Sequence, residues 1–376
     1  MTNWPTVKLG ELLVRRGGSV LPASFPDEEF ELYSIPAHDR DGYEVLAGHL
    51  IGSSKQLVLP GDIMISKIVP HIRRARVVGP RTRWRQIASG EWITFRSDHI
   101  DSNYLRHYLL TDAFHAQFMA TVAGVGGSLL RARPAAVAEL TVPLPLIEEQ
   151  RRIAAILDHA ERILASRRQA VDSLSSLALS VFGAAFSGCA ASFPQLPLRE
   201  LGLVTTGRTP PTAAVGMFDG PVPFITPGDL GSRRAPGRTV SFDGALASRT
   251  VRAGSTLVCC IGATIGKVGI TNEISAFNQQ INAIEWGDAV DDTYGLFAMK
   301  ALKPTIVARG ASTTLPLLPK SKFEELVIPV PPLEEQRKFA RVSAAVSDHA
   351  RVMEEQLERI RALFGSLQAR AFSGRL

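Results

Sequence analysis

The sequence predicts a mixed α/β (α+β) protein with two similar globular domains and two long helices that form an antiparallel coiled coil with pseudo-twofold symmetry. The first observation is a long internal repeat. Leu140 opens LTVPLPLIEEQRRI and Leu326 opens LVIPVPPLEEQRKF, and the copies stay in register to Phe186-Ser187-Gly188 and Phe372-Ser373-Gly374. The second is that each copy continues into a long proline-free helical pattern. The third is that the region before each copy mixes short apolar runs with turn residues.

The repeat divides the chain into four predicted segments. They are a first globular domain at 1–143, a central spacer helix at 144–188, a second globular domain at 189–330 and a distal spacer helix at 331–376. A chain of 376 residues suits two or three domains better than one. Apolar residues make up 45% of it and charged residues 21%, which is typical of a soluble globular protein.

Cysteine usage and hydropathy predict a cytoplasmic protein. The chain has three cysteines, Cys189, Cys259 and Cys260, and an adjacent pair with one distant cysteine is not a disulfide framework. The N-terminus lacks a basic segment followed by an apolar one. No apolar run approaches the ~20 residues of a membrane span, so we expect no membrane association.

Turn and apolar patterns predict local elements in both domains. Pro60-Gly61-Asp62 is a turn signal before a buried strand at Ile63–Ile65. A partial apolar stripe over Asp101–Ala120 predicts one helix. In the second domain Ser255–Ile261 has the apolar composition of a strand, and its adjacent cysteines are expected to be buried.

Each spacer is expected to be one continuous helix, and the first, from Ile147 to Phe186, would be ~60 Å long. Apolar residues recur at three- and four-residue intervals, as in the seam of a helix that packs on another helix. The first seam is Ile153, Ile156, Ala160, Ile163, Ala170 or Val171, Leu174, Leu177 and Val181. The distal seam is Phe339, Val342, Val346, His349, Met353, Gln356, Ile360, Leu363 and Leu367. Its polar members, His349 and Gln356, could fix the register. The alternative is two ordinary amphipathic helices, each on its own domain core.

Basic residues gather locally in the first domain. The net charge of +6 and the pI near 9.4 permit a nucleic acid partner and equally fit an ordinary soluble protein. The candidates for DNA contact are Lys67 and an arginine run that includes Trp84: Arg73, Arg74, Arg76, Arg81, Arg83 and Arg85. Arginine binds phosphates and reads guanine edges. The alternative is a solvated charged loop.

The second domain has sparser candidates. They are Arg208, Arg233, Arg234, Arg238 and Lys267, with the amide cluster Asn278, Gln279 and Gln280. Amide side chains can bond adenine with both of their polar atoms. Alternatively, the three amides satisfy backbone groups at a buried turn.

No catalytic or metal motif is found. Gly262–Val268 resembles a phosphate-binding loop, but three residues separate its glycines where four are needed, and Val268 replaces the Ser/Thr that would hold magnesium. We expect a strand–turn–strand there. His38-Asp39-Arg40-Asp41 could ligate a metal, but an exposed polar turn is the favoured interpretation. The sequence also lacks the glycine-rich signature of a dinucleotide or S-adenosylmethionine domain.

The duplicated helix entry carries a family resemblance. Its residues are Val142-Pro143-Leu144-Pro145-Leu146-Ile147-Glu148-Glu149-Gln150-Arg151 and Ile328-Pro329-Val330-Pro331-Pro332-Leu333-Glu334-Glu335-Gln336-Arg337. With these, the chain resembles the DNA specificity subunits of type I restriction–modification systems. Weaker similarity lies at 7–11, 60–68 and 222–230. Leu146 departs from the pattern, because it stands where the motif usually has a second proline.

The resemblance implies a non-catalytic subunit that serves DNA methylation and host defence. Each globular part would be a target-recognition domain that reads one half of a split DNA sequence. The spacer helices would set the gap, and the motif Glu148, Glu149, Gln150, Arg151 and its copy Glu334, Glu335, Gln336, Arg337 would mark where a domain joins its helix. Two methyltransferase (modification) subunits would bring S-adenosylmethionine, and motor–nuclease (restriction) subunits would use ATP and magnesium. The alternatives are a stand-alone DNA nuclease or methyltransferase with a degenerate site, and a non-catalytic coiled-coil scaffold.

Overall fold

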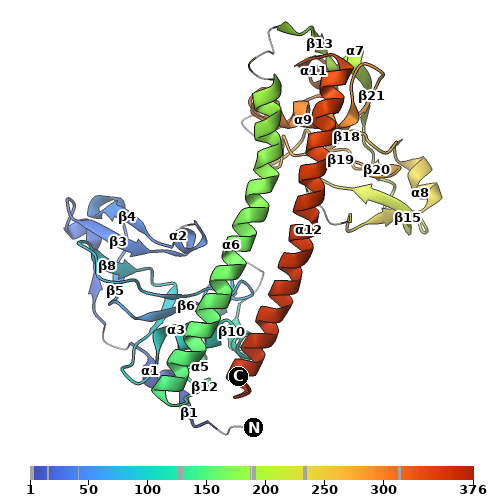
Figure 1. Cartoon of the computed structure of the whole chain (residues 1–376). Helices are drawn as coiled ribbons and strands as arrows, with labels where there is room; N and C mark the ends of the chain where they lie inside the picture. Colours follow the sequence, from blue (N-terminus) through green and yellow to red (C-terminus); the bar gives the residue numbers. More distant parts are fainter. Residues whose placement is uncertain are drawn as a thin grey trace. The chain divides into compact units, whose positions relative to one another are not determined.

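Two compact units make up the fold of the computed structural model. It describes residues 4–14, 17–40, 42–124, 130–186, 188, 192–231, 235–311 and 315–376. The first unit comprises Met1–Arg168 and Gln356–Leu376, and the second comprises Gln169–Glu355. Each unit therefore joins one globular domain to one half of helix α6 (Ile147–Phe186) and one half of helix α12 (Leu333–Phe372) (Figure 1).

The first unit contains three main sheets, with strand orders β2-β5-β8-β3-β4, β7-β6-β9 and β1-β12. Its strands are β1 (Thr6–Lys8), β2 (Ser19–Val20), β3 (Glu29–Tyr33), β4 (Glu44–Ala47), β5 (Lys55–Leu57), β6 (Ile63–Ser66), β7 (Ala75–Val77), β8 (Arg85–Ala88), β9 (Trp92–Phe95), β10 (Val122–Ala123), β11 (Arg131–Ala132) and β12 (Thr141–Pro143). Its short helices are α1 (Leu9–Leu12), α2 (Ile35–Arg40), α3 (Ser102–Leu109), α4 (Asp112–Met119) and α5 (Pro134–Val137), with 3-10 turns η1 (Pro22–Ser24) and η2 (Gly48–Leu50).

The second unit repeats this plan. Its strands are β13 (Gln195–Pro197), β14 (Gly202–Thr206), β15 (Phe218–Ile225), β16 (Thr239–Val240), β17 (Thr250–Val251), β18 (Thr256–Cys259), β19 (Val268–Ile270), β20 (Ser275–Phe277), β21 (Ile281–Trp286) and β22 (Val327–Pro329). Its short helices are α7 (Leu198–Leu201), α8 (Phe242–Ala247), α9 (Asp292–Ala301), α10 (Lys303–Arg309) and α11 (Lys320–Glu324). The order β16-β15-β20-β17 matches β4-β3-β8-β5, and the inner pair is parallel in both. The domains are thus duplicated in fold as well as in sequence.

Local predictions in the domains are partly confirmed. The turn at Gly61 adopts a left-handed φ of 86° and leads into β6, as expected. The single helix predicted over Asp101–Ala120 is wrong, because the segment forms α3 and α4. Thr111 separates them, since its hydroxyl accepts the N–H of Phe114 and caps α4. Cys259 and Cys260 are buried as predicted, and burial raises the pKa of the Cys260 thiol to about 12.

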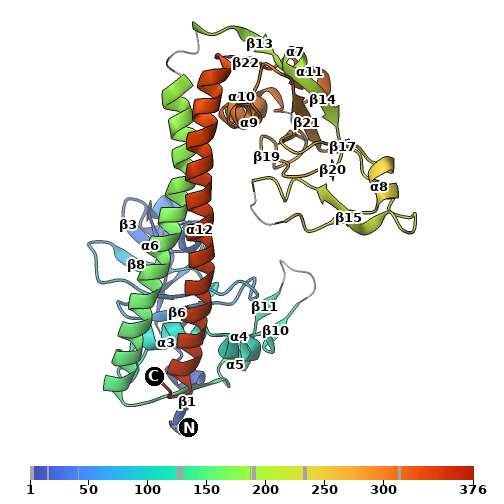
Figure 2. The same cartoon turned by 45° about the vertical axis from the view of Figure 1, so that its right-hand side comes forward.

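The halves of α6 and α12 run antiparallel within each unit (Figure 2). In the first unit, Ile163 of α6 and Ile360 and Leu367 of α12 line one groove. In the second unit, the Phe339 ring lies 5.3 Å from Phe182 of α6 and 5.0 Å from Phe297 of α9, between ring centroids. Aromatic pairs at this separation add to the gain from burial. Each domain core is therefore continuous with its helix pair.

At several positions the buried residue of the helix seam lies one residue after the predicted one. Val342, His349, Gln356 and Leu363 are exposed in α12, and the residues that follow the first three, Ser343, Ala350 and Leu357, are buried. The same shift holds in α6, where Leu157 is buried and Ile163 and Leu177 are exposed. His349 and Gln356 therefore do not lie in the seam. The predicted positions Phe339, Val346, Met353, Ile360 and Leu367 are buried or half-buried.

By length and composition alone, α6 is the one helix among the described residues that could cross a membrane. This is weak evidence, because helices of soluble proteins pass the same test.

Candidate nucleic-acid interface

The glutamine of each helix-entry motif is buried, and it clamps the domain to its long helix. Gln150 Oε1 accepts the N–H of Asp101 at 2.8 Å, and its Nε2 donates to the Pro145 and His99 carbonyls. Gln336 makes the same bonds to Asp291, Pro331 and Ala289. Asp101 and Asp291 are the N-caps of α3 and α9. Each glutamine thus joins a domain helix to the start of a spacer helix.

A tyrosine completes each clamp. Tyr104 donates its hydroxyl to the Pro143 carbonyl at 2.8 Å, and Tyr294 donates to the Pro329 carbonyl at 2.6 Å. We call the sets Asp101, Tyr104, Gln150 and Asp291, Tyr294, Gln336 the entry clamps. The other motif residues, Glu148, Glu149, Arg151, Glu334, Glu335 and Arg337, are exposed or half-buried. The motif therefore holds each domain on its helix, and its charges face solvent.

A hairpin turn is repeated in both domains with the same backbone bonds. In the β6–β7 hairpin, the Val69 N–H donates to the Leu130 carbonyl, and the Val69 carbonyl accepts the Ile72 N–H. In the β18–β19 hairpin, Gly262 bonds to Pro316 and Ile265 in the same way. The carbonyls of Arg74 and Lys267 accept equivalent strand N–H groups, from Ser66 and Cys259. Arg74 and Lys267, predicted separately from the sequence, therefore occupy equivalent positions.

Val69 adopts the left-handed region in this turn, with φ of 46°, where the second domain has Gly262 at 90°. A β-branched residue there is strained. We expect Val69→Gly to raise the free energy of unfolding of the first unit by about 0.5 kcal/mol, because relief of strain exceeds the added unfolded-state entropy. Gly262→Val should lower that of the second unit by about 1–2 kcal/mol. Urea unfolding of both variants measures the two free energies. A lower free energy of unfolding in both variants would contradict the strain at Val69.

Polar loops of the second domain converge on its hairpin turn. Lys267 Nζ donates to the Pro227 carbonyl at 3.5 Å. Asn278 Nδ2 donates to Gln280 Oε1 at 3.1 Å, and Thr209 donates its hydroxyl to Gln279 Oε1 at 2.5 Å. The Arg208 N–H bonds the Phe277 carbonyl, next to the amide cluster. Three loops thus carry the predicted residues Arg208, Lys267, Asn278, Gln279 and Gln280, and the loop at Pro227 supplies a carbonyl to Lys267.

The amide cluster lies at the surface, although it also stabilises its own turn. Asn278 Oδ1 accepts the Gln280 N–H, while the Gln279 side chain is exposed. Arg238 lies away from this group, stacked over Phe218 and Phe224 at 4.6 and 5.7 Å from the ring centroids. Arg233 and Arg234 fall outside the described residues.

The arginine run of the first domain does not form one patch. Arg85 pairs with Phe30 in the β3–β8 register, whereas Arg76 lies over the ring of Tyr33, at the other end of β3. Arg73, Arg74 and Arg85 have acid partners from distant segments, in the pairs Arg73–Asp112, Arg74–Asp39 and Arg85–Glu28 at 2.6 Å each. Lys67 lies 4.0 Å from Glu91. In the described part of the chain, Arg81 and Arg83 have no acid partner, and Arg83 stacks on Trp84.

The prediction of an exposed turn at residues 38–41 is wrong for residues 38–40, which are the part that the structure describes. His38, Asp39 and Arg40 end helix α2, and Asp39 binds Arg74 through both carboxylate oxygens. His38 is half-buried against Trp92. Burial, and then Arg76, lowers the pKa of His38. Sequence periodicity missed this helix because it is only six residues long.

One charged cluster was not foreseen. His107, Asp158 and Glu161 offer ligand atoms close enough for a metal ion. Arg106, however, already binds both carboxylates, at 3.0 Å to Asp158 and 2.7 Å to Glu161. The guanidinium thus supplies the positive charge that a metal would bring. In the second unit the residue three after the clamp tyrosine is Phe297 instead of a histidine. The cluster is therefore a polar contact between α3 and α6.

We expect this contact to weaken in acid. Burial, and then Arg106, lowers the pKa of His107, so the unfolded state takes up the proton first as the pH falls below about 6.5. The stability that neutral His107 contributes is full above that pH and is lost below it, at a slope of at most about 1.4 kcal/mol per pH unit. His107→Gln should flatten the acid limb of the melting temperature of the first unit. An unchanged pH profile would count against this assignment.

Each unit thus joins a mixed α/β domain to a pair of antiparallel half-helices through an entry clamp, and the hairpin turn is repeated in both domains. The model for the type I restriction modification DNA specificity domain matches residues 195–362. A Methanocaldococcus jannaschii protein, provisionally named the MjaX specificity subunit of a type I restriction enzyme, is 21% identical over 248 residues. This match covers 59% of the present chain and 56% of that protein, so the chain spans about half the length of this relative.

Solved structures match over the whole chain. One, from work on the type I R-M system, has a TM-score of 0.57 and 20% identity and covers 100% of this chain and 99% of its own. The S subunit from M. genitalium has a TM-score of 0.57 and 13% identity, with coverage of 98% and 96%. These likenesses confirm the predicted fold class. The chain is therefore similar in sequence to type I restriction–modification DNA specificity subunits, and it shares its overall fold with a solved S subunit.

Proposed function

We propose that the chain is the non-catalytic subunit that selects the DNA sequence for a type I restriction–modification complex in the cytoplasm. Each domain would read one half of a bipartite target. The observation that carries this proposal is the repeated hairpin turn, with a basic residue at the same position, Arg74 or Lys267, in each domain. Duplex DNA is a repeating polyanion, so a turn repeated in two domains suits two half-sites.

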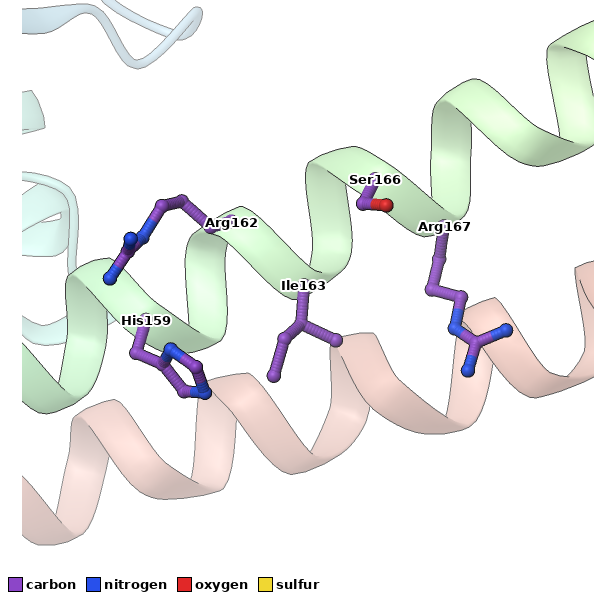
Figure 3. A pocket seen from close by; sticks show the side chains of 5 residues that line it. All are labelled: His159, Arg162, Ile163, Ser166 and Arg167. Carbon is purple, nitrogen blue, oxygen red and sulfur yellow. The ribbon is translucent and has the colours of Figure 1, made fainter.

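The helix pair offers a surface for partner subunits. In the first unit, His159, Arg162, Ile163, Ser166 and Arg167 line a hollow along α6 (Figure 3). Ile163 and Leu363 remain exposed beside the seam, and exposed apolar side chains with a polar rim are typical of protein interfaces. Two methyltransferase subunits, which bring S-adenosylmethionine, would dock on the helices. Restriction subunits would join them and use ATP and magnesium.

Methyl transfer tests this function directly. The purified chain alone should transfer no label from S-adenosylmethionine to DNA, whereas the complex with its modification subunits should methylate adenine in one bipartite sequence. Transfer by the lone chain would instead support a stand-alone methyltransferase. A complex that assembles but never binds duplex DNA would support the scaffold alternative.

Arginines without acid partners give the sharper binding test. Arg81→Ala with Arg83→Ala should weaken duplex binding and reduce its salt dependence by about two counterions if both arginines contact phosphates. Arg40→Ala, an exposed arginine that already pairs with Glu44, is the matched control. Arg74→Ala is less informative, because it leaves Asp39 without its partner.

A further inference from the structure

The glycine-containing turn 262–267 of the second domain has backbone N–H groups without an acceptor. Gly262, Ile265, Gly266 and Lys267 each donate their N–H to a carbonyl within the domain. In the described part of the chain, the N–H groups of Ala263 and Thr264 have no acceptor, and Ala263 is exposed. Successive N–H groups beside a left-handed residue, here Gly262 with φ of 90°, form a concavity that binds anions.

A lysine of the same turn adds positive charge. Lys267 donates to the Pro227 carbonyl at 3.5 Å, and among the described residues no carboxylate lies within ion-pair distance of its ammonium group. Its equivalent in the first domain, Arg74, is instead bound by Asp39. The turn of the second domain therefore combines two unused N–H donors with an uncompensated cation.

We propose that the turn 262–267 binds a phosphate of the DNA backbone, through the N–H groups of Ala263 and Thr264 and the ammonium group of Lys267. The inference rests on the proposed function, because it names the part of DNA that this loop contacts. It also assigns a role to a segment that resembles a nucleotide-binding loop but lacks its magnesium-binding residue at Val268.

The equivalent turn of the first domain favours a contact with a phosphate over a contact with a base. This domain keeps the same turn and the same backbone bonds although Val69 must then adopt a left-handed conformation. Two domains that read different half-sites share only the sugar–phosphate backbone as a ligand. Both domains keep this turn, although in the first domain it forces Val69 into an unfavourable conformation. A turn kept in both domains suits a contact with the sugar–phosphate backbone, which both domains would share. Pro70 stands at the position of Ala263 and has no N–H, so the turn of the first domain offers one N–H donor fewer.

Three variants of the full chain, each in the reconstituted complex, test the proposal. Lys267→Ala removes the cation. Ala263→Pro removes one N–H and copies the first domain, whose turn accommodates Pro70. Lys322→Ala is the matched control, because it removes an exposed lysine of the same domain that pairs with Glu325. Affinity for a duplex with the target and for a duplex without it is measured over a range of salt concentrations.

Lys267→Ala should lower affinity for both duplexes by similar factors and reduce the slope of log K against log salt by about 0.9. Ala263→Pro should lower both affinities several-fold, and Lys322→Ala should change neither. A neutral methylphosphonate placed at the contacted position should weaken binding by the wild type more than binding by Lys267→Ala, which keeps only the N–H contacts. ATP and inorganic phosphate should compete only as general salts do.

Other outcomes are distinguishable. If the wild-type complex binds its target and Lys267→Ala keeps the same slope, the phosphate site is wrong while the proposed function stands. If Lys267→Ala changes which bases are preferred, the lysine reads a base, which also overturns the proposal. Saturable ATP binding that is lost in Lys267→Ala would make the turn a nucleotide site. If the wild-type complex binds no duplex at all, the proposed function itself fails.

Discussion

Gln336→Leu is expected to lower the free energy of unfolding of the second unit by about 3 kcal/mol, because three buried or partly buried groups lose their only side-chain partner. These groups are the N–H of Asp291 and the carbonyls of Ala289 and Pro331. Gln336 is 0% exposed and Pro331 is buried, so water does not replace the bond to the Pro331 carbonyl. Leucine has a similar size and keeps the packing. Denaturant unfolding of the full chain, followed by a probe in the second domain, measures the loss.

The same helix supplies a matched control. Gln356→Leu makes the identical chemical change at an exposed position of α12, and we expect it to change stability by less than about 0.5 kcal/mol. Gln150→Leu should repeat the larger loss in the first unit, because the bonds of Gln150 are the same. Equal effects of the Gln336 and Gln356 substitutions would show that the clamp is not a main contact between domain and helix.

The duplicated plan was predictable from the sequence because a repeat is a long-range signal that needs no knowledge of packing. Leu140 and Leu326 open segments of equal length, and the structure gives both the same clamp glutamine and a helix of 40 residues. The predicted segment boundaries at 143, 188 and 330 stay predictions. The role of Gln150 and Gln336 was not predictable, since a glutamine beside three charged residues looks like part of an exposed helix start.

The seam shows where apolarity is a poor guide to burial. Ser343 and Ala350 are small, so two helices can approach closely over them, and they are buried although neither is strongly apolar. Val342 and Leu363 lie one position away and are exposed. A pattern based on large apolar residues therefore chose Val342 and Leu363, and the seven-residue spacing added His349 and Gln356 between them. The seven-residue repeat of Gln336 and Ser343 becomes visible only with the structure.

The arginine run was divided by strand pairing, which the sequence does not reveal. Arg76 and Arg85 are close in the chain, yet the parallel pairing of β3 with β8 places them at opposite ends of β3. Acid partners such as Asp39 and Asp112 also come from other segments. Candidate status for all these residues, and for Arg208, Arg238 and the amide cluster, stays a prediction until DNA contact is measured.

Insertion of one heptad into each long helix is expected to lengthen the gap between the two half-sites by about three base pairs. The insertions follow Arg168 in α6 and Glu355 in α12, where the two compact units divide. A heptad preserves the seam, which repeats every seven residues from Gln336 through Ser343, Ala350 and Leu357. It adds about 10.5 Å of helix, and one base pair occupies about 3.4 Å of duplex.

The measurement is a map of methylated adenines made with the wild-type and lengthened chains in the same modification complex. Both half-site sequences should persist while only their separation grows, because neither domain is altered. The control inserts four residues into α6 alone, which shifts Val171 and Ala178 out of the seam and should destabilise the helix pair. A lengthened chain that assembles and methylates with the original gap would show that the helices do not set the distance between the reading domains.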